Sequence, residues 1–385
     1  MTRYDATYAH WKQDPEAWWA EAARGIAWDT PPARIFDPSM GVYGRWFPGG
    51  WLNTCFNAVD RHVEAGRGAQ AAIIWDSPMT GRVETITYAQ LLDRVARTAG
   101  ALAARGVAKG DRVVIYLPMV PEAAIAMLAC ARLGAVHSVV FGGFAAAELA
   151  ARIADAKPKA IVTASCGLEP GRIVKYKPLI DAAIGLSPHK PASVLILQRD
   201  ESPCDLTPGR DEDLLEAERA AAPHPCVSVE STDPLYILYT SGTTGAPKGI
   251  LRDHGGHAVA LMHSMSMVYG VEAGDVYWAA SDVGWVVGHS YIVYAPLLAG
   301  CTTVLFEGKP VGTPDAGTFW RVCAQHRVKV LFTAPTAIRA IKKEDPEGEF
   351  LRRHDLSKLE ALYLAGERCD PDTITWSQRL LGKPV

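Results

Sequence analysis

The sequence has 385 residues, of which 49% are hydrophobic and 21% charged, and its formal net charge is -3. This composition is typical of a globular protein, and the length is sufficient for two packed α/β units. No long basic run indicates nucleic acid or a membrane surface as a partner, and no stretch reaches the ~18 apolar residues of a membrane span. We expect a soluble, cytoplasmic protein whose partners are small molecules, and the sequence predicts no oligomeric state.

The eight cysteines form no C-x-x-C pair, and the first residues contain no apolar run that could serve as a secretory signal. Scattered thiols in a chain of this length indicate reduced residues and neither a disulfide framework nor a zinc site. Of the eleven histidines, none has the spacing of a metal ligand beside a second ligand. The sequence therefore predicts no metal-binding residue.

Residues 1–65 are rich in Trp, Pro, Gly and Asn and predict an irregular extension that docks on a larger body. From residue 71 apolar strands alternate with helices, and the strands are expected at 71–77, 111–118, 135–141, 160–165 and 193–198. Long helices are expected within 84–106 and at 121–134, and another from about 145. Residues 200–231 are acidic and Pro-rich and are typical of a surface linker.

A second set of apolar strands is expected at 235–240, 276–281, 302–307, 329–334 and 361–366, with helical segments between them. Nearly continuous apolar strands that alternate with helices indicate parallel sheets covered on both faces. We predict an α/β protein with two packed parallel-sheet subdomains. Their expected ranges are 66–231 and 232–385, after the extension at 1–65.

The segment YTSGTTGAPKG at 239–249 joins the end of a predicted buried strand to three glycines, four hydroxyl groups and one lysine. Glycine lets backbone N–H groups approach a polyphosphate, hydroxyl groups donate to its oxygens, and lysine neutralises charge. The segment is no Walker loop, since Pro247 precedes Lys248 and Gly249 follows it. A flexible linker is the alternative, but the position at a strand end favours a phosphate-binding loop. Its predicted residues are Thr240, Ser241, Gly242, Thr243, Thr244, Gly245 and Lys248.

This loop resembles the signature of the adenylate-forming enzymes, and further segments extend the resemblance along nearly the whole chain. SDVGWVVGHSYIVYAPLLAG at 281–300, FEGKP at 306–310, TAPTAIRA at 333–340 and LAGERCDP at 364–371 follow in the order of acetyl- and propionyl-CoA synthetases. VFGGF at 140–144 and RWFPGGWLNTCFNAVDRHV at 45–63 are similar to the same branch. The segments at 165–172, 176–181 and 309–320 resemble the propionyl-CoA synthetases more.

The resemblance implies two half-reactions. A carboxylate attacks the α-phosphate of ATP to give acyl-AMP and pyrophosphate, and the thiol of coenzyme A then displaces AMP. ATP, Mg²⁺ and coenzyme A are therefore the expected substrates and cosubstrates, with no permanently bound cofactor. Thr240 and Lys248 are the expected catalytic residues in this chain.

The resemblance also assigns residues to the adenine and the acyl group. Gly366, Glu367 and Arg368 match the adenine-contacting motif, although Arg368 replaces the family's proline, and the alternative is a pair of solvated charges at a strand end. Trp285, Val286, Val287 and Ala365 match the acyl pocket. Where the acetate branch has Val, Ala365 leaves space for a longer acyl group, so propionate is the expected substrate, and acetate or butyrate are possible. For the two valines the alternative is plain core packing.

For coenzyme A the match is limited to Gly143 and Arg172, and Glu169 stands where the acetate branch has a second arginine. A carboxylate cannot pair with phosphate, so that half of the expected clamp is altered or absent. The alternative for Arg172 is an ordinary surface arginine.

The chain ends at GKPV, before the segments that supply ribose, metal and lysine contacts in the family. We therefore expect the large-domain part of a ligase that makes no acyl-CoA by itself. A catalytically inactive nucleotide- or CoA-binding module is the alternative from another class. A phosphotransferase is disfavoured, because no Ser or Thr follows Lys248 as in a Walker loop.

Overall fold

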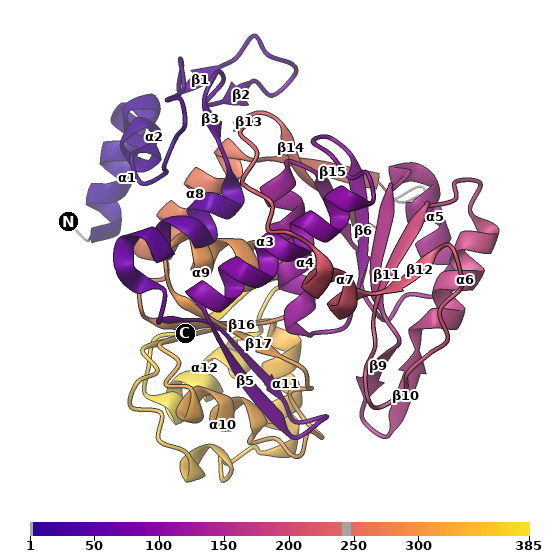
Figure 1. Cartoon of the computed structure of the whole chain (residues 1–385). Helices are drawn as coiled ribbons and strands as arrows, with labels where there is room; N and C mark the ends of the chain where they lie inside the picture. The colour runs from indigo at the N-terminus through magenta and orange to yellow at the C-terminus, as the bar shows by residue number, and fades with distance from the viewer. Residues whose placement is uncertain (1–2, 241–247) are drawn as a thin grey trace.

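The computed structural model describes residues 3–240 and 248–385, which form two largely parallel β-sheets covered by helices (Figure 1). The prediction of an α/β protein with two packed parallel-sheet bodies is confirmed. No helix in the described part of the chain is long and apolar enough to cross a membrane.

The first sheet has seven strands in the order β12-β11-β8-β6-β7-β14-β15. All neighbours are parallel except β14 and β15, which form an antiparallel pair at one edge. Its strands are β6 (Arg112–Tyr116), β7 (Val136–Val139), β8 (Ala160–Ala164), β11 (Ser193–Leu197), β12 (Asp211–Asp213), β14 (Pro234–Thr240) and β15 (Lys248–Asp253).

The second sheet has six strands in the order β19-β18-β16-β17-β4-β5, again parallel except for the edge pair β4 and β5. Its strands are β4 (Ala71–Ser77), β5 (Arg82–Thr87), β16 (Val276–Ala280), β17 (Thr302–Phe306), β18 (Val330–Thr333) and β19 (Ala361–Leu364). Short antiparallel pairs complete the strands: β1 (Phe36–Asp37) with β2 (Arg45–Trp46), β3 (Trp51–Leu52) with β13 (Val229–Glu230), and β9 (Cys166–Glu169) with β10 (Arg172–Lys175).

Each sheet contains two strands that come from the sequence range predicted for the other sheet. β4 and β5 lie within the predicted range 66–231 but belong to the second sheet, while β14 and β15 lie within 232–385 but belong to the first. The sheets therefore do not consist of the two predicted ranges. Apolar periodicity identifies a buried strand, but it carries no information about which sheet edge the strand joins.

The helices cover the faces of the sheets, and their ends follow local signals. The helix α3 begins with a capping box between Thr87 and Gln90, and α4 ends at Gly134, whose φ of 68° favours glycine. The α-helices are α1 (Arg3–Gln13), α2 (Pro15–Ala23), α3 (Tyr88–Ala104), α4 (Pro121–Leu133), α5 (Ala146–Ala156), α6 (Tyr176–Leu186), α7 (Leu214–Ala220), α8 (Gly255–Met267), α9 (Ala295–Leu298), α10 (Thr318–Gln325), α11 (Pro335–Glu344) and α12 (Pro371–Leu381). π-Helical turns occur at η1 (Phe56–Asp60), η2 (Val63–Arg67) and η3 (Gly288–Tyr294), and a 3₁₀ turn at η4 (Leu351–Arg353).

Two segments predicted as irregular contain regular structure. The extension holds α1, α2, η1 and most of η2, and the predicted linker at 200–231 holds β12, α7 and β13. A cap signal was present at α2, where the Asp14 side chain accepts the Ala17 N–H at 3.0 Å and Pro15 opens the helix. The extension does dock through its aromatic rings, since Trp19 packs edge-on against His263 of α8.

Candidate functional site

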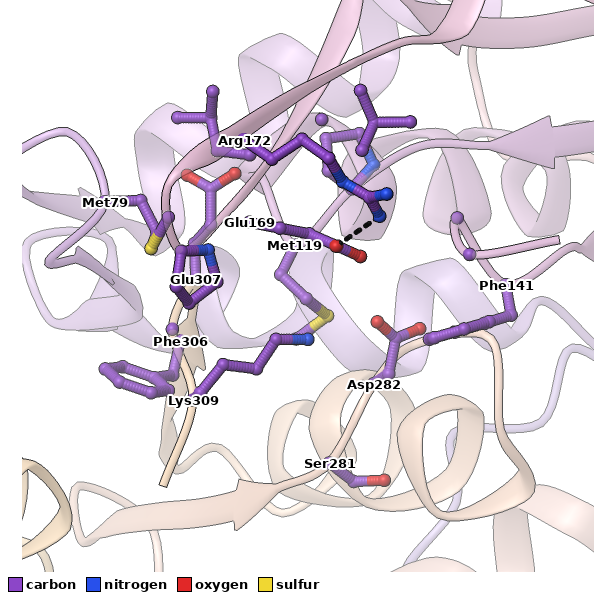
Figure 2. A pocket seen from close by; sticks show the side chains of 18 of the residues that line it. Met79, Met119, Phe141, Glu169, Arg172, Ser281, Asp282, Phe306, Glu307 and Lys309 are labelled. Atoms are coloured by element: carbon purple, nitrogen blue, oxygen red, sulfur yellow. Dashed lines mark hydrogen bonds and ion pairs between the residues drawn. The ribbon is translucent and has the colours of Figure 1, made fainter. Parts of the chain in front are cut away.

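A cavity of about 430 Å³ lies where the carboxyl ends of parallel strands from both sheets meet (Figure 2). Its walls come from the segments after β6 and β7, the β9–β10 hairpin, the start of α6, and the residues after β16 and β17. Ligands of open parallel sheets bind at this end of the strands. Side chains that line the cavity include Met79, Met119, Phe141, Glu169, Arg172, Tyr176, Ser281, Asp282, Phe306, Glu307 and Lys309.

The turn after β7 contains two adjacent glycines because neighbouring rings leave no space for side chains. A Cβ at Gly142 would lie 2.2 Å from the Tyr176 hydroxyl oxygen, and one at Gly143 would lie 2.3 Å from the Phe141 ring. Tyr116 fixes the same turn by donating from its hydroxyl to the Gly142 carbonyl at 3.2 Å. The predicted residue Gly143 thus lines the cavity, and packing alone already requires a glycine there.

A buried ion pair joins the two sheets beside the cavity. Arg199 follows β11 of the first sheet and donates to both carboxylate oxygens of Glu307, which follows β17 of the second, at 2.6 and 3.0 Å. Ser77 donates to the same carboxylate at 2.8 Å. With every charged oxygen paired, this contact fixes the carboxyl ends of the sheets relative to each other.

Arg172 also lines the cavity, as its predicted function requires. It extends from the β9–β10 hairpin and pairs with Glu169 at 2.6 Å (Figure 2), and the Arg172 side chain is largely exposed while that of Glu169 is half-buried. Glu169 is thus paired with the arginine that would bind a phosphate. The structure brings Gly143 and Arg172 to one cavity, and the Glu169 carboxylate beside Arg172 weakens the attraction of this arginine for an anion.

Two charged residues that the sequence analysis did not identify face the same space. Asp282 follows β16 and accepts the Gly284 N–H at 2.8 Å. Burial raises the pKa of its carboxyl group to about 6, against the smaller lowering effects of the Gly284 hydrogen bond and of Lys309. The Lys309 N–H donates to the Thr313 hydroxyl group at 2.9 Å, which fixes the backbone there. Each residue follows a predicted apolar strand within one to three positions, and that signal could have identified both.

The predicted phosphate loop begins and ends on the antiparallel pair β14–β15. Thr240 and Lys248 are cross-strand partners at the base of the loop, and both are exposed. β14 runs parallel to β7, so Thr240 lies at the carboxyl ends of the strands of the first sheet, as does the glycine turn at 141–144. Ser241, Gly242, Thr243, Thr244 and Gly245 lie outside the described residues.

The four predicted acyl residues do not share one cavity in the described part of the chain. Trp285 and Val286 are exposed, Val287 is half-buried against the main core, and Ala365 is exposed after β19. The Trp285 ring packs on Phe141 of the cavity at a centroid distance of 5.3 Å. Val286 lines a separate hollow of about 510 Å³ between α8, Trp19 and Trp46.

The predicted adenine residues follow β19, again at a carboxyl end. Gly366 has a φ of 97°, which favours glycine. Glu367 accepts from the Thr336 hydroxyl group at 2.7 Å and pairs with Arg339 at 2.7 Å. The hydrogen bond from the Thr336 side chain is the main cause that lowers the pKa of Glu367.

One cluster of metal-ligand types exists among the described residues, outside the cavity. The ligand atoms of Cys55, Asp60 and Cys226 lie within 4.8 Å of one another. Arg132 donates to both Asp60 oxygens at 2.9 and 2.8 Å and lies 3.8 Å from the Cys55 sulfur. Because this guanidinium already neutralises the carboxylate, we assign no metal to the cluster.

Comparison with known proteins places this geometry in context. Residues 59–385 match the family described as AMP-binding enzyme, and residues 4–58 match the acetyl-coenzyme A synthetase N-terminus. The chain is 59% identical to an uncharacterized protein of Pseudomonas aeruginosa, over 97% of this chain and 59% of that protein. It is 52% identical to human acyl-CoA synthetase short-chain family member 3, mitochondrial (100% and 56%), and 50% identical to propionate–CoA ligase of Salmonella typhimurium (97% and 59%).

Proposed function

Because the chain belongs to the family of AMP-binding enzymes, we propose that it is the nucleotide- and acyl-binding part of an ATP-dependent short-chain acyl-CoA synthetase. The chain spans 56–59% of the length of the relatives described above. The observation that carries the proposal is the cavity at the carboxyl ends of both sheets, together with a phosphate-type loop on the same edge. The reaction converts a carboxylate, ATP and coenzyme A into acyl-CoA, AMP and pyrophosphate.

In this proposal the nucleotide lies along the carboxyl ends of the strands. Thr240 donates to the polyphosphate and Lys248 neutralises its charge, with Mg²⁺ entering as the companion of ATP. Exposure of both side chains at the loop base is compatible with such contacts. Positioning and charge neutralisation supply most of the catalysis in phosphoryl chemistry, and the composition of this loop suits both tasks.

Coenzyme A would occupy the cavity of about 430 Å³, with its thiol-bearing arm between the glycine turn and the residues after β16. Arg172 would hold a phosphate at the rim after exchanging Glu169 for it. Propionate is the proposed acid, supported by Ala365 and by the similarity to propionate–CoA ligase. The free thiols of all eight cysteines are compatible with a cytoplasmic location.

The substitution Lys248→Ala tests this assignment in the protein expressed at its natural length. Loss of a charged phosphate contact costs ~1.5–3 kcal/mol, so exchange of labelled pyrophosphate into ATP is expected to slow by roughly ten- to a hundredfold. Lys358→Ala, an exposed lysine outside every cavity described above, is the matched control. An unchanged exchange rate in Lys248→Ala contradicts the assignment.

An inactive nucleotide- or CoA-binding module is the alternative that the same features allow. Calorimetry on the 385-residue chain and a thioester assay on the natural-length protein separate the two proposals, because an inactive module would bind ATP without making acyl-CoA at either length. We expect the chain alone to bind ATP weakly and to make no acyl-CoA. Thioester formation by the 385-residue chain would contradict that expectation, and a natural-length protein without thioester activity would favour the inactive module.

A further inference from the structure

We propose that Asp282 accepts the thiol proton of coenzyme A in the second half-reaction, an inference that rests on the proposed function. The thiol sulfur forms a bond to the acyl carbon of acyl-AMP, and its proton passes to a carboxylate oxygen of Asp282. The bond between the acyl carbon and the phosphate oxygen then breaks, and AMP leaves as the anion. No electron is exchanged with an outside group, so the step needs no further reactant.

The pairing of the carboxylates in the cavity distinguishes Asp282 from the others. Glu307 is bound by Arg199 and Ser77, and Glu169 is bound by Arg172. Asp282 forms no ion pair with any described residue, and the Gly284 N–H at 2.8 Å is the hydrogen bond that it accepts. Of the three cavity carboxylates, it therefore keeps an oxygen available for a proton.

The position of Asp282 links the cavity to the predicted acyl segment. It lies three residues before Trp285, whose N–H donates to the Asp282 carbonyl at 3.1 Å. The Trp285 ring packs on Phe141 of the cavity wall. Figure 2 shows the Asp282 carboxylate directed into the cavity, beside Phe141 and facing the Glu169–Arg172 pair. A thiol that reaches the acyl segment through this cavity would pass the carboxylate.

The surrounding charges are compatible with a base. The groups that face Asp282 are Lys309 after β17, Glu307 on the same segment, Tyr176 of α6, and the Glu169–Arg172 pair of the hairpin. Burial raises the pKa of Asp282 to about 6, so the group is ionised at pH 7.5 and yet more basic than an ordinary carboxylate. A base with a pKa near the working pH is the more effective proton acceptor.

A purely structural role is the competing explanation, because the hydrogen bond from Gly284 closes a turn of the kind that Asp and Asn both form. Asp282→Asn keeps the accepting oxygen and removes the base. This variant therefore separates the two roles, and Glu349→Gln, an exposed carboxylate far along the chain on the surface, is the matched control.

The experiment measures both half-reactions of the natural-length enzyme. In Asp282→Asn we expect pyrophosphate exchange within twofold of the wild-type rate, while single-turnover thioester formation from acyl-AMP falls about a hundredfold, the range of a lost general base. We also expect the acid limb of the wild-type pH profile, near pH 6, to disappear in the variant.

Three results would overturn the inference. They are a wild-type thioester rate in Asp282→Asn, an equal fall of both half-reactions, and an acid limb that persists in the variant. In each case the proposed function still stands if the wild-type enzyme exchanges pyrophosphate into ATP. A wild-type protein without exchange activity would instead refute the proposed function itself.

Discussion

Four buried histidines of the first sheet and its neighbours make the stability of the chain sensitive to mild acid. Burial lowers the pKa of His254 and His289 to about 4 and that of His257 to about 3, and it places the pKa of His137 well below its usual value. The rings of His137 and His289 stack on each other, and His137 forms a hydrogen bond with the Tyr294 hydroxyl group at 2.6 Å.

The sign follows from proton binding. Below pH 6.5 the unfolded chain protonates each histidine while the folded chain does not, so stability falls as the pH drops from 6.5 towards the folded pKa near 4. Each histidine lowers the free energy of unfolding by about 1.4 kcal/mol per pH unit below 6.5, which amounts to about 2 kcal/mol at pH 5. His254, His257 and His289 together lose about 6 kcal/mol at that pH.

Carboxyl groups with raised pKa values act in the opposite direction. Asp282, with a pKa of about 6, regains about 1 kcal/mol between pH 7 and 5, because the folded chain takes up its proton first. The net loss from these four groups alone, about 4–5 kcal/mol, is a large fraction of a typical stability of about 5–15 kcal/mol.

Urea unfolding at pH 7.5, 6 and 5, followed by tryptophan fluorescence, measures this loss as a falling midpoint. His254→Gln removes one group that binds a proton in the unfolded chain and not in the folded chain. The variant should therefore reduce the dependence of the unfolding free energy on pH by about 1.4 kcal/mol per pH unit. A midpoint that stays constant from pH 7 to 5 would refute the reasoning, as would a variant with the wild-type slope.

Three further substitutions test the site. Ala365→Val should lower kcat/KM for propionate and move the preference towards acetate, within the roughly 10–200-fold that one methylene is worth, and an unchanged ratio of the two acids would remove Ala365 from the acyl pocket. Gly142→Ala brings a Cβ within 2.2 Å of the Tyr176 oxygen, so it should cost ~1–3 kcal/mol in urea unfolding, part of which Tyr176→Phe restores; no restoration would contradict the steric argument. Glu307→Leu leaves the buried Arg199 with Glu201, at 3.5 Å, as its ion-pair partner and should cost up to about 3–5 kcal/mol by the same measurement. A neutral effect would show that the pair does not hold the sheets together.

The apolar strands were predictable because burial on both faces leaves a direct pattern in the sequence. β6, β8, β11 and β17 each lie within a predicted run, and α4 ends before the predicted glycine, Gly134. The assignment of strands to sheets was not predictable, since it depends on which edges are open in the folded chain. The N-terminal helices were missed because their aromatic residues pack on α8, and that contact is invisible without the fold.

The resemblance to short-chain acyl-CoA synthetases is confirmed by the comparisons, and the roles of individual residues remain predictions. Gly143 and Arg172 were predicted from motifs, and the structure places both in one cavity. The pairing of Arg172 with Glu169 was not predicted, because an ion pair across a hairpin turn depends on the turn conformation. Asp282 and Lys309 each follow a predicted strand and lie within segments that resemble the family, but neither was given a role until the structure placed both at one cavity.

The exchange of edge strands between the sheets has a consequence for how the chain can be divided. A cut near residue 231 would leave the N-terminal piece with the β4–β5 hairpin and no second sheet to receive it, and it would remove β14 and β15 from the edge of the first. During synthesis β4 has to wait for its parallel neighbour β17, more than 200 residues later. The two sheets are therefore expected to behave as one inseparable unit in limited proteolysis, in split-protein complementation and on the ribosome.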